Sequence, residues 1–238
     1  MTLLAVNRLC KTFRGLRAID DVSFDIAQGS ITSIVGPNGA GKSTLFNMIS
    51  GYLKPTAGDV QLAGERITGM APYVIAGRGI ARAFQIAKPF PALSVERNVM
   101  VAALFGRTGE RDVDATVDRA IATCRREAWR PVAASTRSIG NLRRLELARA
   151  IAARPLLLLA DEPCAGLNET ETREVTDAIA GIRQQGMTVL LVEHDIRAVR
   201  KISDRVIVLE AGRKIAEGTA EDVFSRQDVI DAYLGTAA

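Results

Sequence analysis

The apolar residues of this chain follow two periods, and each period predicts a different kind of element. Short runs that are apolar at every position predict strands covered on both faces, and 188–192 is one of them. In 18–26 the apolar residues alternate with Ser23 and Asp25, which is the period of a half-buried antiparallel strand. The strands expected on these grounds are 3–13 and 18–26, paired through a turn at Gly15, and then 31–35, 59–62, 156–160, 188–192 and 206–209, the last of which should complete the sheet.

Apolar residues spaced three and four apart predict helices between these strands. The segment 94–128 shows this spacing, for example at Val113 and Val117, and we expect two or three helices there. The stretch 63–79 has no clear period, and 131–136 has the composition of a loop. The other expected helices are 45–49, 142–152, 170–184, 196–202 and 220–234.

Strands that alternate with helices predict an α/β fold, with a mainly parallel sheet covered by helices on both faces. Ligands of such sheets bind at the carboxyl ends of the strands. The first two strands predict an additional antiparallel β subdomain, and the strand-free segment 87–152 predicts an inserted helical subdomain. We therefore expect one domain over 1–238, whose α/β core is formed by 1–86 and 153–238.

Composition indicates a folded protein and disfavours a nucleic-acid partner. Of the 238 residues, 47% are hydrophobic and 24% are charged, which suits one large core or a core with a smaller subdomain. The net charge of +4 does not by itself select a partner. Aromatic residues make up only 5% of the chain, which argues against base-stacking platforms.

Cysteine usage and the start of the chain predict a cytoplasmic protein. Cys10, Cys124 and Cys164 have no metal-ligand spacing and form no even set, so reduced thiols are expected. Polar residues from Asn7 onward interrupt the apolar start, so no signal peptide is expected. No run approaches the roughly 20 apolar residues of a membrane span. Any role at a membrane would therefore be exercised from its surface, through a partner.

The segment 36–44 carries the strongest chemical signal. It matches the phosphate-binding pattern G-x-x-x-x-G-K-[ST] at every fixed position and lies between a predicted strand and a predicted helix. Glycines let backbone N–H groups surround phosphate oxygens, and the helix directs its positive end at the same anion. Lys42 is expected to reach the β- and γ-phosphates, and Ser43 to bind Mg²⁺. The alternative is a glycine-rich turn without a ligand. The expected ligand residues are Gly36, Pro37, Asn38, Gly39, Ala40, Gly41, Lys42, Ser43 and Thr44.

Two acids follow the apolar run 156–160. Asp161 is suited to hold Mg²⁺ through water at the tip of a strand expected beside the phosphate loop, and Glu162 is suited to polarise the attacking water. The alternative is that both acids cap a following helix. Together with the phosphate loop, the acids predict a P-loop NTPase core.

Further motifs follow in an order that makes the chain resemble the ATP-binding subunits of ABC transporters over essentially its whole length. These motifs are Phe13, Arg82-Ala83-Phe84-Gln85, Ser138-Ile139-Gly140-Asn141 with Arg143 to Arg149, Ala165-Gly166-Leu167-Asn168, and His194 after Val192-Glu193.

The resemblance implies ATP and Mg²⁺ as ligands and a role for each matched residue. Phe13 would stack on adenine, and Gln85 would contact Mg²⁺ and relay to a transmembrane subunit. Ser138 and Gly140 would touch the γ-phosphate of an ATP bound by a second ATPase subunit, and His194 would hold the γ-phosphate. The implied catalytic set is Lys42, Gln85, Glu162 and His194, and the implied metal set is Ser43, Gln85 and Asp161.

Taken singly, some of these residues have plainer interpretations. Phe13 would be an ordinary core residue, and Gln85 an exposed loop glutamine. His194, the only histidine in the chain, would be a polar residue whose hydrogen bonds are satisfied locally, or a helix cap. Its position after the apolar run 189–192, beside the strand that ends at Glu162, favours a place near the γ-phosphate instead.

The signature segment departs from the Leu-Ser-Gly-Gly-Gln typical of the family. Ser138 and Gly140 are retained, but Arg137 replaces an apolar residue, Asn141 is one methylene shorter than glutamine, and Leu142 stands where a second glutamine is common. These departures predict a slow or impaired site. The intact signature of a different ATPase partner would compensate for them.

Several stretches look most like the ATPases of high-affinity branched-chain amino acid importers. They are 79–85, 165–168, 192–195 and 229–235. The resemblance implies import of branched-chain amino acids or a related small polar solute, from the inner face of the cell membrane. It also implies transmembrane permease subunits, a second ATPase subunit of the same or a different kind and, indirectly, a solute-binding protein as partners.

Three alternatives remain open from the sequence. The chain would also suit an ABC exporter ATPase for lipid or lipopolysaccharide. A soluble ABC protein that acts on nucleic acid or ribosomes usually has two ATPase units or a long coiled coil, and this chain has neither. The altered signature would also suit an ATPase that binds nucleotide for regulation only.

Overall fold

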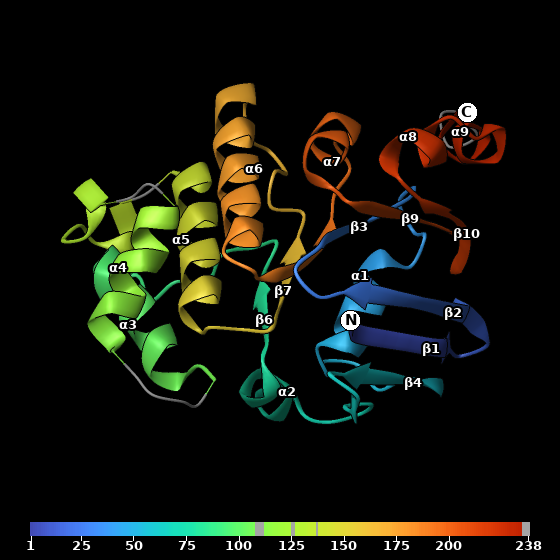
Figure 1. The fold of residues 1–238 in the computed structure, drawn as a ribbon, viewed down its shortest axis with the longest axis horizontal. Helices are drawn as coiled ribbons and strands as arrows, with labels where there is room; N and C mark the ends of the chain where they lie inside the picture. The colour runs from blue at the N-terminus through green and yellow to red at the C-terminus, as the bar shows by residue number, and fades with distance from the viewer. Residues whose placement is uncertain (108–111, 125–126, 137, 235–238) are drawn as a thin grey trace.

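The computed structural model describes residues 1–107, 112–124, 127–136 and 138–234, and a six-stranded sheet runs through the middle of this part (Figure 1). The strand order is β10-β9-β3-β8-β7-β6. Neighbouring strands from β9 to β6 are parallel, and β10 pairs antiparallel with β9 at one edge. The strands are β3 (Ile31–Val35), β6 (Ile80–Ala83), β7 (Leu157–Asp161), β8 (Thr188–Val192), β9 (Arg205–Glu210) and β10 (Arg213–Gly218).

The central strands are buried throughout, as their apolar runs predict. Every residue of β3, β7 and β8 is buried. Because both faces of these strands are covered, the residues that point to either face are mostly apolar, which explains the continuous apolar runs. The predicted mainly parallel α/β sheet is confirmed.

A second sheet of four antiparallel strands lies beside the first, in the order β2-β1-β4-β5. Its long hairpin pairs Val6 with Phe24, and Val6 also lies opposite Val60 on β4. The predicted antiparallel β subdomain is therefore confirmed. The strands are β1 (Thr2–Phe13), β2 (Leu16–Ala27), β4 (Ala57–Leu62) and β5 (Glu65–Arg66).

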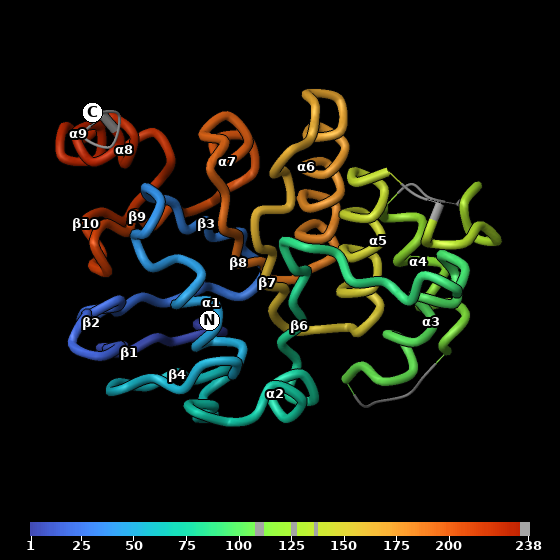
Figure 2. Tube along the Cα trace, turned by 180° about the vertical axis from the view of Figure 1, so that it is seen from behind, coloured from blue at the N-terminus to red at the C-terminus, as the bar shows by residue number. Residues whose placement is uncertain are grey.

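Helices cover one face of the six-stranded sheet, and α1 with the antiparallel sheet covers the other (Figures 1 and 2). Because side chains alternate between the faces of a strand, β7 contributes Leu158 to the first layer and Leu159 to the second. Leu158 packs with residues of α3 to α6, whereas Leu159 packs with Phe46 of α1. Helices α7, α8 and α9 extend the first layer over β9 and β10. The helices are α1 (Lys42–Ile49), α2 (Pro72–Arg78), α3 (Val95–Phe105), α4 (Val113–Thr123), α5 (Ile139–Ala152), α6 (Glu169–Gln184), α7 (Ile196–Ile202), α8 (Ala220–Phe224) and α9 (Gln227–Leu234).

Helices α3, α4 and α5 lie together at one end of the molecule, between β6 and β7 in the chain (Figure 1). Their mutual packing is apolar, with Val99, Ile121 and Leu147 in one buried cluster. The helical segment expected between the two halves of the core is therefore present. The subdomain boundaries at 87 and 152 remain a prediction. None of the described helices is both long and apolar enough to cross a membrane.

The structure contains elements that the sequence analysis did not assign, and it corrects two that it did. The stretch 63–79 contains β5 and α2, and α2 is too short for a clear period but starts with a proline and ends at Gly79, which has a φ of 110°. The segment 80–83, for which no strand was expected, is β6. The strand at 206–209 does not complete the sheet, because the tight turn at Ala211 and Gly212 leads into β10. The predicted helix 220–234 is two helices, α8 and α9.

Candidate functional site

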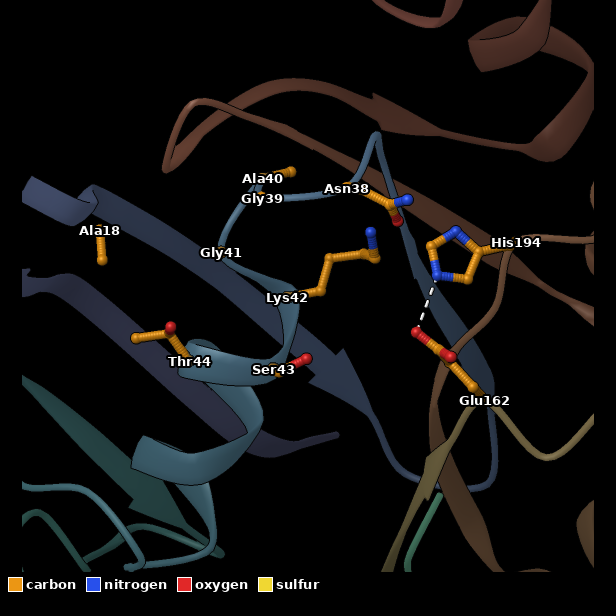
Figure 3. A pocket seen from close by; sticks show the side chains of 10 residues that line it. All are labelled: Ala18, Asn38, Gly39, Ala40, Gly41, Lys42, Ser43, Thr44, Glu162 and His194. Carbon is orange, nitrogen blue, oxygen red and sulfur yellow. Dashed lines mark hydrogen bonds and ion pairs between the residues drawn. The ribbon is translucent and has the colours of Figure 1, made fainter. Parts of the chain in front are cut away.

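An open pocket of about 210 Å³ lies at the carboxyl ends of the parallel strands, where ligands of such sheets bind (Figure 3). One wall is formed by the loop between β3 and α1, the first turn of α1 and Ala18 of β2, and the other by the residues that follow β7 and β8. The lining residues are Ala18, Asn38, Gly39, Ala40, Gly41, Lys42, Ser43, Thr44, Glu162 and His194.

The glycines of this loop let it fold closely against its neighbours. Gly36 has a φ of 147°, and a Cβ added there would lie 2.0 Å from the Leu209 carbonyl oxygen. Gly41, with a φ of 101°, immediately precedes α1, and a Cβ there would lie 2.7 Å from the Ala18 carbonyl oxygen. The loop can therefore approach β2 and β9 while its backbone turns into α1, whose amino end faces the pocket.

Lys42 directs its amine into the loop. Its side chain leaves the first turn of α1, the residue is only 5% exposed, and Nζ donates to the carbonyl oxygens of Gly36 at 2.7 Å and Pro37 at 2.9 Å. Burial lowers the pKa of Lys42, and the carboxylates of Glu162 and Asp161 oppose this effect. A bound anion would raise the pKa of Lys42, because a negative charge beside the amine favours its protonated form.

Glu162, Gln85 and His194 meet across the pocket from Lys42. Glu162 Oε1 lies 2.7 Å from His194 Nε2, and Glu162 Oε2 accepts a hydrogen bond from Gln85 Nε2 at 2.5 Å (Figure 3 draws the first of these). The side chain of Glu162 is 15% exposed. Three residues that the sequence analysis assigned to catalysis are thus brought into direct contact from three separate segments.

Glu193 fixes the turn that carries His194. It is buried, and its carboxylate accepts hydrogen bonds from the backbone N–H of Cys164 at 2.7 Å and of His194 at 3.0 Å. Burial raises the pKa of the Cys164 thiol, and the charge of Glu193 adds to the effect. The thiol therefore stays protonated beside the carboxylate.

The strand order corrects one detail of the sequence analysis. Asp161 ends β7, which was expected beside the strand of the phosphate loop, but β8 lies between β7 and β3. β7 and β8 are adjacent, as expected, and Asp161 pairs with Val192. Glu162 and His194 accordingly emerge from adjacent strands, and the phosphate loop emerges one strand further along.

The predicted metal ligands are chemically suited to Mg²⁺, because Ser43, Gln85 and Asp161 all carry the oxygen ligands that this ion prefers. In the described ranges no three His, Cys, Asp or Glu residues form a metal-binding group. Magnesium is usually held by one or two carboxylates together with substrate phosphates, so the donor set fits such a site. Asp161 Oδ2 accepts a hydrogen bond from Arg82 at 2.6 Å.

Some described residues predicted to bind nucleotide or metal do not line this pocket. The carbonyl oxygens of Gly36 and Pro37 accept hydrogen bonds from Lys42, which does line the pocket. Gln85 likewise contacts a lining residue, because it donates a hydrogen bond to Glu162. Phe13 is 42% exposed at the end of β1, with Lys11 Nζ 5.0 Å from its ring centre. The others that do not line it are Asp161, Ser138 and Gly140.

The signature residues lie at the amino end of α5, on the opposite face of the sheet from α1. Ser138 is the N-cap and is exposed, and Gly140 is buried where a Cβ would lie 2.4 Å from Glu171 of α6. The Asn141 side chain accepts a hydrogen bond from Arg144 at 3.3 Å. Arg137 lies outside the described residues. The effect of the altered signature therefore remains a prediction.

Sequence reasoning missed two residues that bear on the site. Arg82 of β6 donates a hydrogen bond to Asp161, a contact that the motif ending at Gln85 did not indicate. Tyr233 of α9 packs against the buried cluster that contains Val35, and its hydroxyl interacts with the backbone of Gly36, while burial raises its pKa. The apolar spacing of the tail was visible in the sequence, but its contact with the phosphate loop was not, because nearly 200 residues separate the two.

Comparisons with known proteins agree on one family. Residues 19–165 match the family described as ABC transporter, and residues 213–238 match the one described as branched-chain amino acid ATP-binding cassette transporter. The high-affinity branched-chain amino acid transport ATP-binding protein LivG of Salmonella typhimurium is 39% identical over 99% of this chain and 98% of its own.

Solved structures with the same fold include nucleotide-bound and dimeric proteins. A crystal structure of the ADP conformation of an ATP-binding cassette of an ABC transporter has a TM-score of 0.88 at 28% identity, and the match covers 99% of each chain. The dimeric structure of a bacterial ABC transporter cassette has a TM-score of 0.80 at 26% identity, over 92% of this chain and 99% of that one.

Proposed function

This chain belongs to the family of ABC transporter ATP-binding proteins, and from that premise we propose that it is the ATP-hydrolysing subunit of an importer for branched-chain amino acids or a related small polar solute. The observation that carries the proposal is the pocket in which the phosphate loop faces Glu162 and His194. The carboxyl-terminal family match and the LivG relative favour import over export of lipid.

ATP binding follows from the loop. Its backbone N–H groups and the amino end of α1 attract the phosphates, and Lys42 supplies a positive charge beside them. Lys42 is held by the carbonyl oxygens of Gly36 and Pro37, so its amine is oriented before the nucleotide arrives. Phe13, at the end of β1, is the candidate surface for the adenine ring.

Hydrolysis is assigned to the residues across the pocket. Glu162 accepts a proton from the water that attacks the γ-phosphorus, and His194, which also contacts Glu162, holds the γ-phosphate. Gln85 donates a hydrogen bond to the Glu162 carboxylate and helps to hold it in place. Mg²⁺, bound through Ser43, Gln85 and Asp161, would neutralise charge on the phosphate oxygens. Most of the rate enhancement then comes from positioning and charge neutralisation.

A second ATPase subunit completes the site in this proposal. Ser138 is exposed at the amino end of α5, on the other face of the sheet from α1, so its hydroxyl is available to the phosphates of an ATP held by a neighbour. The likeness to a dimeric cassette supports this arrangement. We further propose that the assembly docks from the cytoplasm on permease subunits, and indirectly serves a solute-binding protein.

Uptake into vesicles tests the proposal. The chain is co-expressed with candidate permease subunits and a candidate second ATPase subunit, the complex is reconstituted, and ATP-dependent uptake of labelled leucine is measured. Wild type should energise uptake, and Lys42→Ala should abolish it and weaken ATP binding by about tenfold or more, because hydrogen bonds to charged groups are worth roughly 1.5–3 kcal/mol. Lys201→Ala, an exposed lysine that binds Asp177, is the control. A wild-type complex that does not respond to ATP would refute the proposal.

A further inference from the structure

Arg82 occupies the centre of a contact network behind the pocket. It lies on β6 opposite Leu159 of β7, so its side chain shares a face of the sheet with Asp161, two residues further along β7. This face is covered by α1. Arg82 is therefore placed between the helix that follows the phosphate loop and the strand that carries the predicted metal ligand.

The guanidinium group joins these two elements by hydrogen bonds. Nη2 donates to Asp161 Oδ2 at 2.6 Å, and Nη1 donates to Asn47 Oδ1 at 2.7 Å and to Ser50 Oγ at 3.2 Å, at the end of α1. The side chains of the Arg82–Asp161 pair are only 9% and 8% exposed. Such a pair is screened little by solvent, so its attraction is weakened by salt less than that of a surface pair.

Aromatic rings hold the guanidinium in one orientation. Its central carbon lies 4.9 Å from the ring centre of Phe84, 5.8 Å from that of Phe46 and 5.9 Å from that of Tyr52, all within the range of cation–π attraction. Phe84 and Tyr52 also pack edge to face, with their centres 5.8 Å apart. Since Phe84 precedes Gln85, the same arginine touches the segment that carries a second predicted metal ligand.

From these contacts we propose that Arg82 is a positioning residue for magnesium binding. It orients the carboxylate of Asp161 and, through Phe84, the segment of Gln85, and it ties both to α1 and hence to Ser43. A metal ligand held by a hydrogen bond from a neighbouring side chain binds its ion more tightly than one that must be ordered on binding. This inference rests on the proposed function, because it requires the magnesium nucleotide to bind in the pocket.

The alternative is that Arg82 is structural and only neutralises a buried charge. A structural role would affect nucleotide binding equally with and without Mg²⁺. A positioning role affects only the gain in affinity that Mg²⁺ produces. Affinity for a fluorescent ATP analogue, measured in EDTA and over a Mg²⁺ titration, separates the two roles without any use of hydrolysis.

Arg82→Lys is the test variant, because lysine keeps the charge but cannot bridge Asn47 and Asp161 with a planar fork. In EDTA, we expect the affinity for the analogue to be unchanged. The Mg²⁺ concentration that produces half of the gain in affinity should rise by about tenfold or more, which is the usual loss when a residue that supports a metal ligand is changed. Binding of Mn²⁺ to the nucleotide complex, followed by electron paramagnetic resonance, should weaken in parallel. Arg78→Lys, which alters a partly exposed arginine paired with Glu65 outside this network, is the matched control.

Asn47→Ala keeps the test decisive if thermal unfolding shows that Arg82→Lys is not folded. It leaves the ion pair chemically intact and removes one hydrogen-bond acceptor of the guanidinium, so a smaller shift in the same direction is expected. An unchanged Mg²⁺ requirement in the folded variants, or an equal loss of affinity in EDTA, would overturn the inference. Wild type that does not bind the analogue at all would instead refute the proposed function.

Discussion

Glu162 is the residue on which the proposed chemistry depends most. Its φ of 48° places it in the left-handed region, where residues other than glycine are uncommon. Its two carboxylate oxygens contact His194 and Gln85. The backbone at this point therefore adopts an unfavourable conformation that brings the carboxylate to the pocket, an arrangement often found at functional sites.

Glu162→Gln should separate binding from hydrolysis. Glutamine has the same size and can still contact His194 and Gln85, but it cannot accept a proton from water. We expect ATP affinity to be retained and turnover to fall by at least about a hundredfold, since a general base is worth roughly 10²–10⁴ in rate. Phosphate release and titration with a fluorescent ATP analogue measure the two quantities. Turnover close to that of wild type would remove Glu162 from this role.

The sequence predicts the residues of the pocket wherever a local pattern carries the chemistry. The phosphate loop is a contiguous motif, and Glu162 follows directly on an apolar run. Arg82 stands in the motif that ends at Gln85, but no local pattern shows its contacts, because its partners Asn47 and Asp161 come from distant segments and meet only in the fold. The same reason hides the contact of Tyr233 with the loop.

At the scale of elements, Asp20 links the two sheets. It lies on β2, and its carboxylate accepts hydrogen bonds from Arg213 Nε of β10 at 2.8 Å and from Arg17 at 2.7 Å. Its backbone N–H also donates to the Gly212 carbonyl oxygen. The hydrogen bonds from Arg213 and then Arg17 lower the pKa of Asp20 below its ordinary value of 3.8.

This shift predicts a pH-dependent contribution to stability. Because the folded-state pKa of Asp20 lies below the unfolded value, its stabilisation is fully present above pH 3.8 and is lost as the pH falls through the folded pKa. Asp20→Asn should therefore be less stable than wild type at pH 7, and the difference should shrink under acid conditions. Urea unfolding of both proteins, at pH 7 and at a pH below 3.8, measures the difference in the free energy of unfolding. The same change at the exposed neighbour Asp21 is the control, and a difference that grows in acid would contradict the assignment.

Elements were predictable where their period is long and regular. The continuous runs of β3, β7 and β8 and the amphipathic α6 are examples. The short elements were not predictable, because α2 spans only seven residues and β10 exists as a strand through its pairing with β9 rather than through its own pattern. Tertiary pairing, not local preference, decides such edge strands.

At the scale of the whole molecule, the predicted ATP contacts are divided between two faces. The phosphate loop and Glu162 line one pocket, whereas Ser138 lies at the amino end of α5, on the far face of the sheet from α1. In the proposed function, one chain would therefore present half of each of two sites. If two subunits join head to tail, each completes the pocket of the other.

Mixing two inactive variants tests this account most directly. Lys42→Ala removes the loop amine, and Ser138→Arg blocks the exposed amino end of α5 without altering a buried residue. In a preparation in which the wild-type chain hydrolyses ATP, each variant alone should be inactive. A mixture should regain phosphate release, because the mixed dimer contains one site with an intact loop and an intact α5 end. Full activity of Ser138→Arg by itself would contradict the claim that a second subunit completes the site.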